Sequence, residues 1–233
     1  MLLASSPSPG PPEPPSKRVF AYVDAQNLFN AAKEAFDEFD GYDFPGYDPI
    51  KLTETICRIQ SWTLEKLHIY TGLPAPSDPR HTWWNRKLQV LASRDVFTFA
   101  RSVRYSEQDV TLKSGVTVRG RVAREKGVDV RIALDVVRHA FEQRYEVALI
   151  YSQDQDLSEA VADVKLIASQ QDRWIKTASA FPVGASNISP VTGEKRNARG
   201  INGTKEIKIQ KALYDACLDP RDYRLPLSQT KPA

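Results

Sequence analysis

Four aspartates stand at places in the sequence where a carboxylate could do chemistry. Asp24 ends the apolar run VFAYVD, and Asp154 and Asp156 directly follow the apolar run YEVALIY. Asp129 lies in EKGVDVRIALD, in the first turn of a predicted helix, where free N–H groups and the helix dipole stabilise an anion. Each acid alone is better explained by an ordinary role, because Asp is a common N-cap and turn residue.

The arrangement of predicted strands and helices is what brings these acids together. Segments typical of strands alternate with amphipathic segments, which predicts an α/β fold with a Rossmann-like, doubly wound, mostly parallel sheet. Functional groups in such sheets gather at the carboxyl ends of strands, so three segments would deliver four carboxylates to one edge. Carboxylates packed that closely raise one another's pKa, and a divalent cation relieves the repulsion. Oxygen ligands select Mg²⁺ or Mn²⁺ over Zn²⁺.

The predicted elements follow from hydrophobic periodicity and turn residues. Strands are predicted over residues 19–24, 64–72, 95–106, 145–151, 173–181 and around 206–209. Helices are predicted over residues 25–38, 50–61, 81–93, 127–143, 156–171 and 211–218. An inserted β-hairpin is predicted over 107–122, where VTL and VTV flank the turn Lys113-Ser114-Gly115. The near-continuous apolar run at 145–151 is typical of a central parallel strand covered on both faces.

The composition predicts one folded domain between two tails. Residues 1–16 hold six prolines among Ser and Gly, which predicts a disordered or polyproline-like tail. A single α/β domain is expected over 17–225, with a C-terminal tail at 226–233. Residues 182–204 are rich in Asn, Gly, Pro and Ser, and we expect an extended surface loop there.

The bulk properties exclude some classes of protein and leave others open. The net charge of +3, from 32 basic and 29 acidic residues, neither requires nor excludes a nucleic-acid partner. Cys57 and Cys217 lack metal-ligand spacing and are expected to be reduced thiols. No apolar run reaches membrane-spanning length, and the N-terminus lacks the pattern of a signal peptide. We therefore expect a soluble cytoplasmic protein with no membrane partner.

Other titratable residues are interpreted as structural. Asp135 has Arg131, Arg138 and His139 at helical spacing, which a solvated ion-pair face explains. The chain's three histidines are scattered along the sequence and show no metal-ligand spacing. We expect neither group to take part in chemistry.

Three motifs together resemble the NYN family of PIN-like nucleases. They are YVDAQNLF (22–29), EKGVDVRIALDVV (125–137) and LIYSQDQDLSEAV (149–161), and their order, spacing and strand context match from about Lys17 to Ala180. The resemblance implies a PIN-like sheet with an acidic metal site and a ribonuclease activity. The chain departs from the family pattern at Gln153, where Gly is common, and at Leu157, where an aromatic residue is common.

The resemblance also implies roles for individual residues. The positions that match the family's metal-binding acids are Asp24, Asp129, Asp154 and Asp156. Asp24 would be the central ligand, while Asp156 would bind directly or through water. Asn27 matches a polar residue that would orient Asp24 or contact phosphate, and Ser152 matches a hydroxyl that would hold an acid or a water. One or two Mg²⁺ or Mn²⁺ ions would then activate water for attack on a phosphodiester.

Basic and aromatic residues are candidates for contacting the substrate. Arg119, Arg121, Arg124 and Lys126 belong to a basic stretch around the predicted hairpin, where Arg119 and Arg121 share a face and could track phosphates. A hydrated edge hairpin, protected from aggregation by its charges, is an equal alternative. The aromatic residues that could stack on bases are Trp83, Trp84 and Tyr105, although core packing also suits a Trp. Further basic residues in the late loop are Lys195, Arg196 and Arg199.

The expected function is a metal-dependent ribonuclease that cuts single-stranded or structured RNA, with an endonuclease favoured. The partner would be RNA, with DNA kept as an alternative, and a homodimer stays open. The main rival is a non-catalytic module that binds RNA or protein on the same fold. A phosphatase or nucleotide hydrolase fits less well, because YVDAQN lacks the second acid of a phosphoaspartate-forming loop. A nucleotide-binding Rossmann role is weaker still, because no Gly-rich turn follows the first strand.

Overall fold

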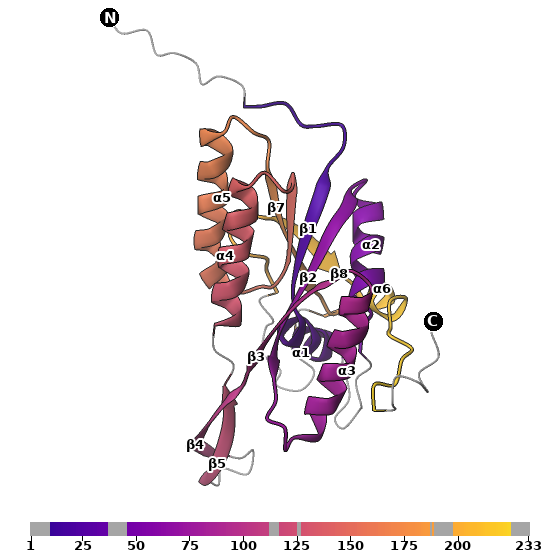
Figure 1. Cartoon of the computed structure of the whole chain (residues 1–233), viewed down its shortest axis with the longest axis vertical. Coiled ribbons are helices and arrows are strands. Elements are labelled where there is room, and N and C mark those ends of the chain that lie inside the picture. The colour runs from indigo at the N-terminus through magenta and orange to yellow at the C-terminus, as the bar shows by residue number, and fades with distance from the viewer. Residues whose placement is uncertain are drawn as a thin grey trace, which may run out of the picture.

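The protein is a parallel β-sheet with helices on both faces and a hairpin extending from one end (Figure 1). The computed structural model describes residues 10–36, 46–111, 117–124, 127–186, 188 and 198–224. The predicted tail at 226–233, most of the predicted tail at 1–16, and Lys113, Lys126, Lys195 and Arg196 lie outside these residues.

The strands of the sheet are parallel, and from β1 to β7 helices lie between them in the chain. Their bounds are β1 Arg18–Asp24, β2 Thr63–Leu73, β3 Phe97–Ser102, β6 Val147–Tyr151, β7 Lys176–Pro182 and β8 Lys205–Ile209. Within the described residues the order across the sheet is β3-β2-β1-β6-β7-β8, and every neighbouring pair is parallel. The predicted α/β class and doubly wound sheet are confirmed. All five residues of β6 are buried, as expected for a central strand covered on both faces.

The strand order reverses direction between β1 and β6, which makes this position the topological switch point of the sheet. The chain builds outward from β1 through β2 to β3 on one side, and from β6 through β7 to β8 on the other. Connections therefore leave β1 and β6 toward opposite sides, which separates the loops at their carboxyl ends. Ligands of open α/β sheets bind outside the carboxyl ends of the strands at such a switch point. Asp24 ends β1 and Ser152 follows β6, so both lie at this point.

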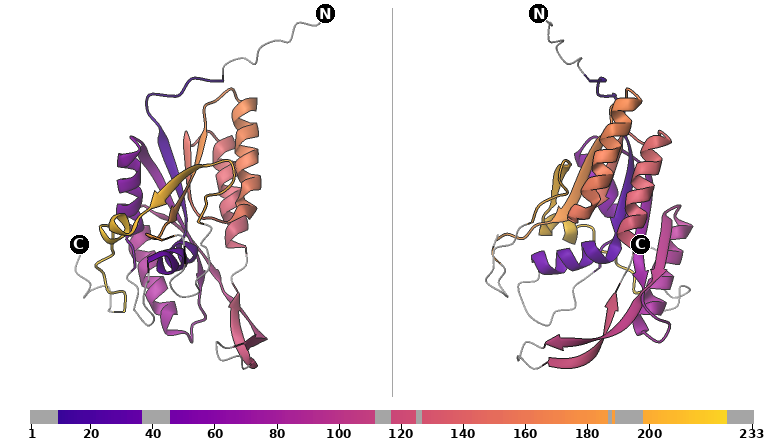
Figure 2. Two further views of the ribbon diagram at one scale, coloured as in Figure 1. Left: turned by 180° about the vertical axis from the view of Figure 1, so that it is seen from behind. Right: turned by 90° about the vertical axis from the view of Figure 1, so that its left-hand side faces the viewer.

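The helices cover the two faces with separate hydrophobic cores. Their bounds are α1 Ala25–Phe36, α2 Pro49–Ile59, α3 Pro79–Ser93, α4 Val128–Phe141, α5 Ser158–Gln170 and α6 Lys211–Asp215. Buried residues of α1, α2, α3 and α6 pack on one face, around Leu28, Ile56 and Tyr214. Buried residues of α4 and α5 pack on the other, around Val136 and Val164. Both views in Figure 2 show these two layers enclosing the sheet.

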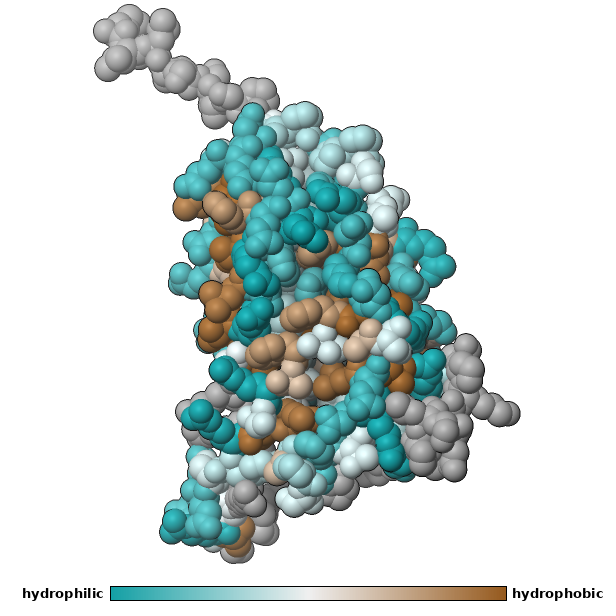
Figure 3. All heavy atoms as spheres, viewed as in Figure 1, coloured by the Kyte–Doolittle hydropathy of each residue, from teal (hydrophilic) through white to brown (hydrophobic). Residues whose placement is uncertain are grey.

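Helix α4 is apolar on more than its buried side. The side predicted to be buried is confirmed for Val128, Ile132, Val136 and Ala140, with Ala133 and Val137 partly buried. The exposed side carries Val130, Leu134 and Phe141, of which Phe141 is 68% exposed. Apolar side chains accordingly reach the surface over α4 and α5 in Figure 3.

The inserted hairpin forms a separate two-stranded sheet that extends away from the domain (Figure 2). It consists of β4 Arg104–Thr111 and β5 Thr117–Arg124, which are antiparallel. The predicted strand over 95–106 was wrong in part, because β3 ends at Ser102 and the chain then continues into the hairpin. Val103 lies between the two strands, and its N–H donates to the carbonyl of Leu73 at the end of β2.

The chain after β7 is not the continuous surface loop that its composition suggested. Residues 187 and 189–197 lie outside the described part, but the end of the predicted loop is packed against the domain. Ile201 is buried, and the N–H of Gly200 donates to the Glu206 carboxylate. Among the described residues, no helix has both the length and the apolar character that crossing a bilayer requires.

Candidate active site

Asp24 occupies the junction where the last residue of β1 becomes the start of α1. Its Oδ1 accepts a hydrogen bond of 3.0 Å from the backbone N–H of Asn27, so its carboxylate caps α1. The predicted orienting role of Asn27 is thus performed by the backbone, while the side chain of Asn27 is exposed. Asp24 is therefore held at the switch point by the free N–H groups of a helix N-terminus.

The turn after β6 carries the second acid. Val23 pairs with Tyr151, so Asp24 and Ser152 leave the sheet side by side on neighbouring strands, which lie about 4.8 Å apart. The Ser152 hydroxyl is buried and accepts from the N–H of Asp154 at 3.1 Å. Ser152 therefore sets the backbone of the turn and the position of Asp154.

Asp154 and Asp156 have different surroundings within this turn. The Asp154 Oδ1 accepts from the N–H of Asp156 at 3.0 Å, so Asp154 caps the 3₁₀ turn Gln155–Leu157 that precedes α5. The capping role considered for these acids is confirmed for Asp154. Asp156 is exposed at the start of the same turn.

Asp129 lies in the first turn of α4, as predicted. Gly127 precedes the helix with φ of 79°, a left-handed conformation that glycine adopts without steric cost. The Arg101 side chain lies against Gly127, and a Cβ added there would clash with its guanidinium. Arg101 thereby connects the end of β3 to the beginning of α4, close to Asp129.

The pKa of Asp24 is affected by two of the other predicted acids. The pKa of Asp24 is raised to about 6, mainly because burial desolvates its carboxylate. The negative charges of Asp129 and Asp154 raise it further, while the N–H groups of Asn27 and Gln26 oppose the shift. The structure thus brings Asp24, Asp129 and Asp154 into mutual electrostatic range.

These side chains are of the chemical type that binds a hard divalent cation. The donors are carboxylate oxygens, and the raised pKa of Asp24 shows that this site disfavours an isolated negative charge. Within the described residues, however, no three His, Cys, Asp or Glu side chains already converge as metal ligands. Mg²⁺ is commonly held by one or two carboxylates with waters and substrate phosphates completing its shell, so the acids present suffice.

Two glutamines attach the late part of the chain to this edge. The Gln153 amide donates to the carbonyl of Arg199 at 3.2 Å, and the Gln155 amide donates to the carbonyl of Gly200 at 3.0 Å. The Gln155 carbonyl also accepts from the N–H of Asn202. Gln153, where the chain departs from the family pattern, therefore has a structural role: its side chain holds the backbone of Arg199 beside the turn that carries Asp154 and Asp156. No local sequence signal indicates these contacts, because the partners lie about 45 residues apart.

The hairpin register pairs basic residues with acids across the strands. Arg119 lies opposite Asp109 and Arg121 opposite Glu107. The Arg119 guanidinium also forms an exposed ion pair with Glu107 at 3.2 Å. This favours the hydrated-hairpin interpretation for Arg119, whereas Arg124, opposite Arg104 at the base, has no such acid across from it.

Asp135 is not on a solvated face, so that prediction was wrong. Its side chain is 2% exposed, and it is neutralised by Arg131 at 2.9 Å and Arg138 at 2.7 Å. The Tyr70 hydroxyl donates to it at 2.9 Å. The predicted ion pairs are therefore confirmed, but they cover a buried carboxylate rather than a surface charge.

Two of the histidines are not scattered in space. The rings of His68 and His139 lie 5.0 Å apart, and Tyr22 stacks on both. The Tyr22 hydroxyl hydrogen-bonds His139 Nδ1 at 3.0 Å. Burial, together with the nearby His139, lowers the pKa of His68 to about 4, which keeps it neutral. They form part of the core under α4, consistent with the structural role expected for them.

Comparisons with known proteins identify the family. The model of the NYN domain matches residues 18–168. No curated protein matches the chain. Among solved structures, MurG from Acinetobacter baumannii is similar over 82% of this chain and 45% of its own length, with 8% identity and a TM-score of 0.29. A likeness that weak supports no argument, and this chain spans less than half of MurG. The NYN match covers well over half of the chain and includes all four edge aspartates, so the protein belongs to the NYN domain family of PIN-like nucleases.

Proposed function

We propose that this protein is a metal-dependent ribonuclease that hydrolyses phosphodiester bonds within RNA. The observation that carries the proposal is the state of Asp24. Its carboxylate sits at the switch point between β1 and β6, and its pKa is raised to about 6 by burial and by the charges of Asp129 and Asp154. A group with a strongly perturbed pKa at the ligand-binding edge of an α/β sheet is a candidate functional group.

The residues that would hold Mg²⁺ or Mn²⁺ are Asp24, Asp129 and Asp154. The chemistry supplied by such an ion when bound is the activation of a water and the neutralisation of charge on the phosphate. Asp156, which is exposed on the turn after β6, would bind the ion through a water.

The chain's own residues prepare this edge before a substrate arrives. The N–H of Asn27 fixes the Asp24 carboxylate, and the Ser152 hydroxyl fixes the backbone of Asp154. The Asp154 carboxylate itself accepts from the N–H of Asp156. Both carboxylates therefore cap the start of a helical turn, which fixes their orientation. Preorganised charges of this kind act without the cost of rearrangement during the reaction.

A second candidate function is a non-catalytic module that binds RNA on the same fold. It is favoured by one observation, that the described residues contain no ready-made cluster of three metal-ligating side chains. The two functions differ in what Asp24→Asn does. A nuclease loses cleavage with this change, whereas a binding module keeps its affinity for RNA and gains some of it, because repulsion of the phosphates falls.

The test compares labelled RNA with a DNA of matched sequence, each incubated with Mn²⁺, with Mg²⁺ and with a chelator. Wild type, Asp24→Asn and the control Asp163→Asn are assayed together, since Asp163 is an exposed acid of α5 away from the edge. We expect metal-dependent cleavage of RNA by wild type and by Asp163→Asn, with none by Asp24→Asn. RNA binding without cleavage in every metal would support the binding module instead.

A further inference from the structure

A cavity of about 760 Å³ lies beside the acidic edge, between α1, α3 and the C-terminal segment Asp219–Arg224. This volume falls within the range of about 300–1,000 Å³ that is typical of sites for small ligands. The C-terminal segment lies outside the range that matches the family model, so one wall of the cavity is built by a part of the chain that the family motifs do not explain.

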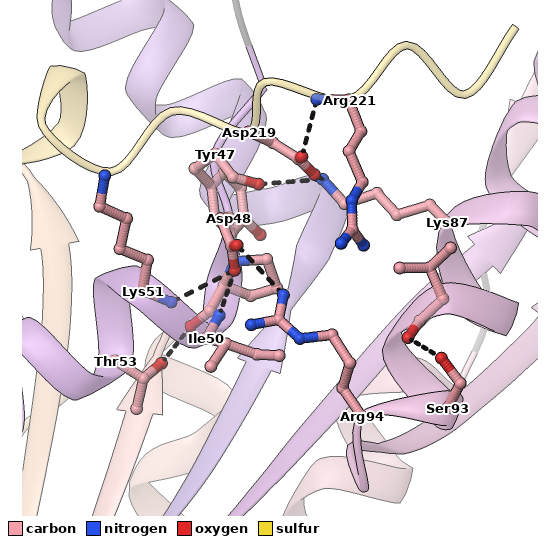
Figure 4. A network of polar contacts seen from close by, with 12 residues as sticks. Tyr47, Asp48, Ile50, Lys51, Thr53, Lys87, Ser93, Arg94, Asp219 and Arg221 are labelled. Atoms are coloured by element: carbon pink, nitrogen blue, oxygen red, sulfur yellow. Dashed lines mark hydrogen bonds and ion pairs between the residues drawn. The ribbon is translucent and has the colours of Figure 1, made fainter. Parts of the chain in front are cut away.

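A buried ion pair holds this segment in place. The Lys87 ammonium of α3 lies 3.3 Å from the Asp219 carboxylate, and both side chains are 7% exposed. Lys87 also donates to the carbonyl of Tyr47 at 2.9 Å, as Figure 4 shows. The Tyr223 hydroxyl donates to Asp219 at 2.8 Å. Because these partners come from three separate segments, the cavity wall is a fixed part of the fold.

The cavity is lined by aromatic rings. Trp83 contacts Trp84 and Tyr223 edge-to-face, with ring centroids 5.0 Å and 5.4 Å apart. Trp84 also packs against the core, whereas Trp83 and Tyr223 join α3 to the C-terminal segment. Aromatic side chains are the usual platform on which proteins stack single-stranded bases.

Basic side chains outnumber acidic ones around this cavity. Four of the lining residues are basic and two are acidic. Lys87 and Asp219 neutralise each other inside the wall, and the Arg224 guanidinium binds Asp222 at 2.9 Å. The remaining two, Arg80 and Arg221, lie at the cavity, with Arg80 paired to Asp78 outside it. Apolar rings with a net positive charge suit a ligand that has a flat ring and a phosphate.

The cavity is bounded by the first turn of α1, which begins directly after Asp24. Ala25 and Gln26, which line it, directly follow Asp24 in the chain, and neighbouring Cα atoms are about 3.8 Å apart. The Tyr47 hydroxyl donates to the carbonyl of Ala25 at 3.3 Å. The Gln26 amide donates to the carbonyl of Gly72 near the end of β2 at 2.7 Å, which fixes the first turn of α1. An RNA phosphate held at the acidic edge would therefore lie next to the first turn of α1, which forms one wall of this cavity.

We propose that the cavity binds an unpaired base of single-stranded RNA next to the bond that is cut. This inference rests on the proposed nuclease function and adds the substrate class, because a base that is stacked and paired in a duplex cannot enter a pocket of this kind. Trp83 provides the stacking surface and Arg221 the positive charge at the cavity.

Binding is tested in chelator, so that RNA stays intact. Fluorescence anisotropy compares a labelled single strand with the same strand in a duplex, using wild type, Trp83→Leu and Arg221→Gln. The matched controls are Trp174→Leu and Arg144→Gln, which lie at the opposite end of the sheet. We expect the single strand to bind at least tenfold more tightly than the duplex, and Trp83→Leu to lose about tenfold in affinity. Arg221→Gln should lose affinity as well, while both controls keep it.

A second measurement avoids any effect of Trp83→Leu on folding. Titration of wild type with uridine and adenosine 5′-monophosphates should quench tryptophan fluorescence, and Arg221→Gln should weaken this binding. Equal affinity for single strand and duplex, or mononucleotides that leave the fluorescence unchanged, would overturn the proposal and favour a peptide as the occupant.

The failure of this inference is distinguishable from that of the proposed function. Cleavage of RNA in Mn²⁺ at a saturating RNA concentration reports the acidic edge, because every protein molecule then carries substrate. We expect this cleavage to require Asp24, and Trp83→Leu to raise the RNA concentration that gives half-maximal cleavage. If cleavage depends on Asp24 but the affinity for RNA is the same in wild type, Trp83→Leu and Arg221→Gln, the proposed base site is wrong and the proposed nuclease function is retained.

Discussion

The molecule buries two aspartates, Asp24 and Asp135, in opposite ways. Asp135 is almost fully buried on the side of α4 that faces the sheet, where two arginines and the Tyr70 hydroxyl satisfy its oxygens. Asp24 is partly buried at the switch point, where its carboxylate accepts from backbone N–H groups and its charged neighbours are other acids. No basic side chain of the described residues forms an ion pair with Asp24. One carboxylate is neutralised by the chain itself, and the other is not.

This difference separates a structural charge from a functional one. A buried carboxylate with its own arginines has its oxygens occupied and leaves none for a ligand, and removing it strands the arginines. A desolvated carboxylate among like charges costs folding free energy, and a protein keeps such strain where a ligand or a cation relieves it. Asp24 is of the second kind, and the predictions below test the contrast.

The largest effect is expected for Asp135→Ala. The change leaves Arg131 and Arg138 without their shared partner and the Tyr70 hydroxyl without an acceptor. Because both arginines reach solvent in part, we expect the lower end of the range for breaking a buried pair, about 3 kcal/mol of unfolding free energy lost. Urea denaturation measures it as a lower midpoint at unchanged slope. A loss below about 1 kcal/mol would mean that Asp135 is no better paired than a surface acid.

Asp24→Asn should have the opposite sign. Asparagine caps a helix as well as aspartate does, so the bond from Asn27 is retained while the buried charge is removed. A pKa of about 6 in the folded state, against an ordinary Asp, corresponds to a gain on the order of 2–3 kcal/mol at pH 7 in chelator. The control Asp163→Asn should leave stability unchanged. A less stable Asp24→Asn would show that the carboxylate is needed for the fold.

The pH dependence of stability should identify the same carboxylate. Between about pH 4 and pH 6 the folded protein keeps a proton on Asp24 that the unfolded chain releases. The free energy of unfolding contributed by this group therefore falls as pH rises through that window, and stays low above it. Wild type and Asp24→Asn should be equally stable near pH 4 and diverge by pH 7. Parallel curves would assign the raised pKa to another group.

The edge acids could be found from the sequence because their position follows from local patterns. An apolar strand ending in Asp24, and another ending before Asp154, are visible without the fold, and parallel strands place both ends at one edge. The doubly wound topology follows from the same alternation of strands and helices. Local pattern and global fold agree along this part of the chain.

Residues whose role depends on distant partners could not be found in this way. Asp135 looks like a surface acid because its arginines are three and four residues away, but Tyr70, 65 residues earlier, shows that this side of α4 faces the sheet. Gln155 and the cavity at Lys87 depend on segments 45 and more than 130 residues away. Periodicity reports which side of a helix is apolar, and it cannot report which charged side chain the sheet will cover.

Mn²⁺ should stabilise the protein through Asp24, by an amount smaller than the two substitutions above. A ligand at ten times its dissociation constant contributes about 1.4 kcal/mol to the unfolding free energy. Wild type should therefore melt at a higher temperature in Mn²⁺ than in chelator at pH 7, and Asp24→Asn should show no such shift. Asp135→Ala should keep the shift, although it melts lower in both conditions. A shift that Asp24→Asn retains would place the ion elsewhere.

The smallest effect is expected in the hairpin, where Arg119→Gln removes an exposed ion pair with Glu107. Such pairs contribute little to folding, so stability should change by no more than about 0.5 kcal/mol. If Arg119 instead contacts an RNA phosphate, the alternative that the sequence left open, the slope of log affinity against log salt should fall by about 1 in Arg119→Gln. Affinity is measured in chelator by fluorescence anisotropy at several salt concentrations.

Glu107→Gln is the informative partner of Arg119→Gln, because it frees the guanidinium without removing it. We expect it to tighten RNA binding at low salt, because Arg119 no longer has to leave the Glu107 carboxylate in order to bind an RNA phosphate. A hairpin whose charges only keep its strands hydrated predicts no change in slope for either substitution. Arg119 at the surface resembles Asp135 in the interior, because each is already paired with a charge of opposite sign. A guanidinium that Glu107 neutralises has less charge available for a phosphate, and Glu107→Gln measures how much.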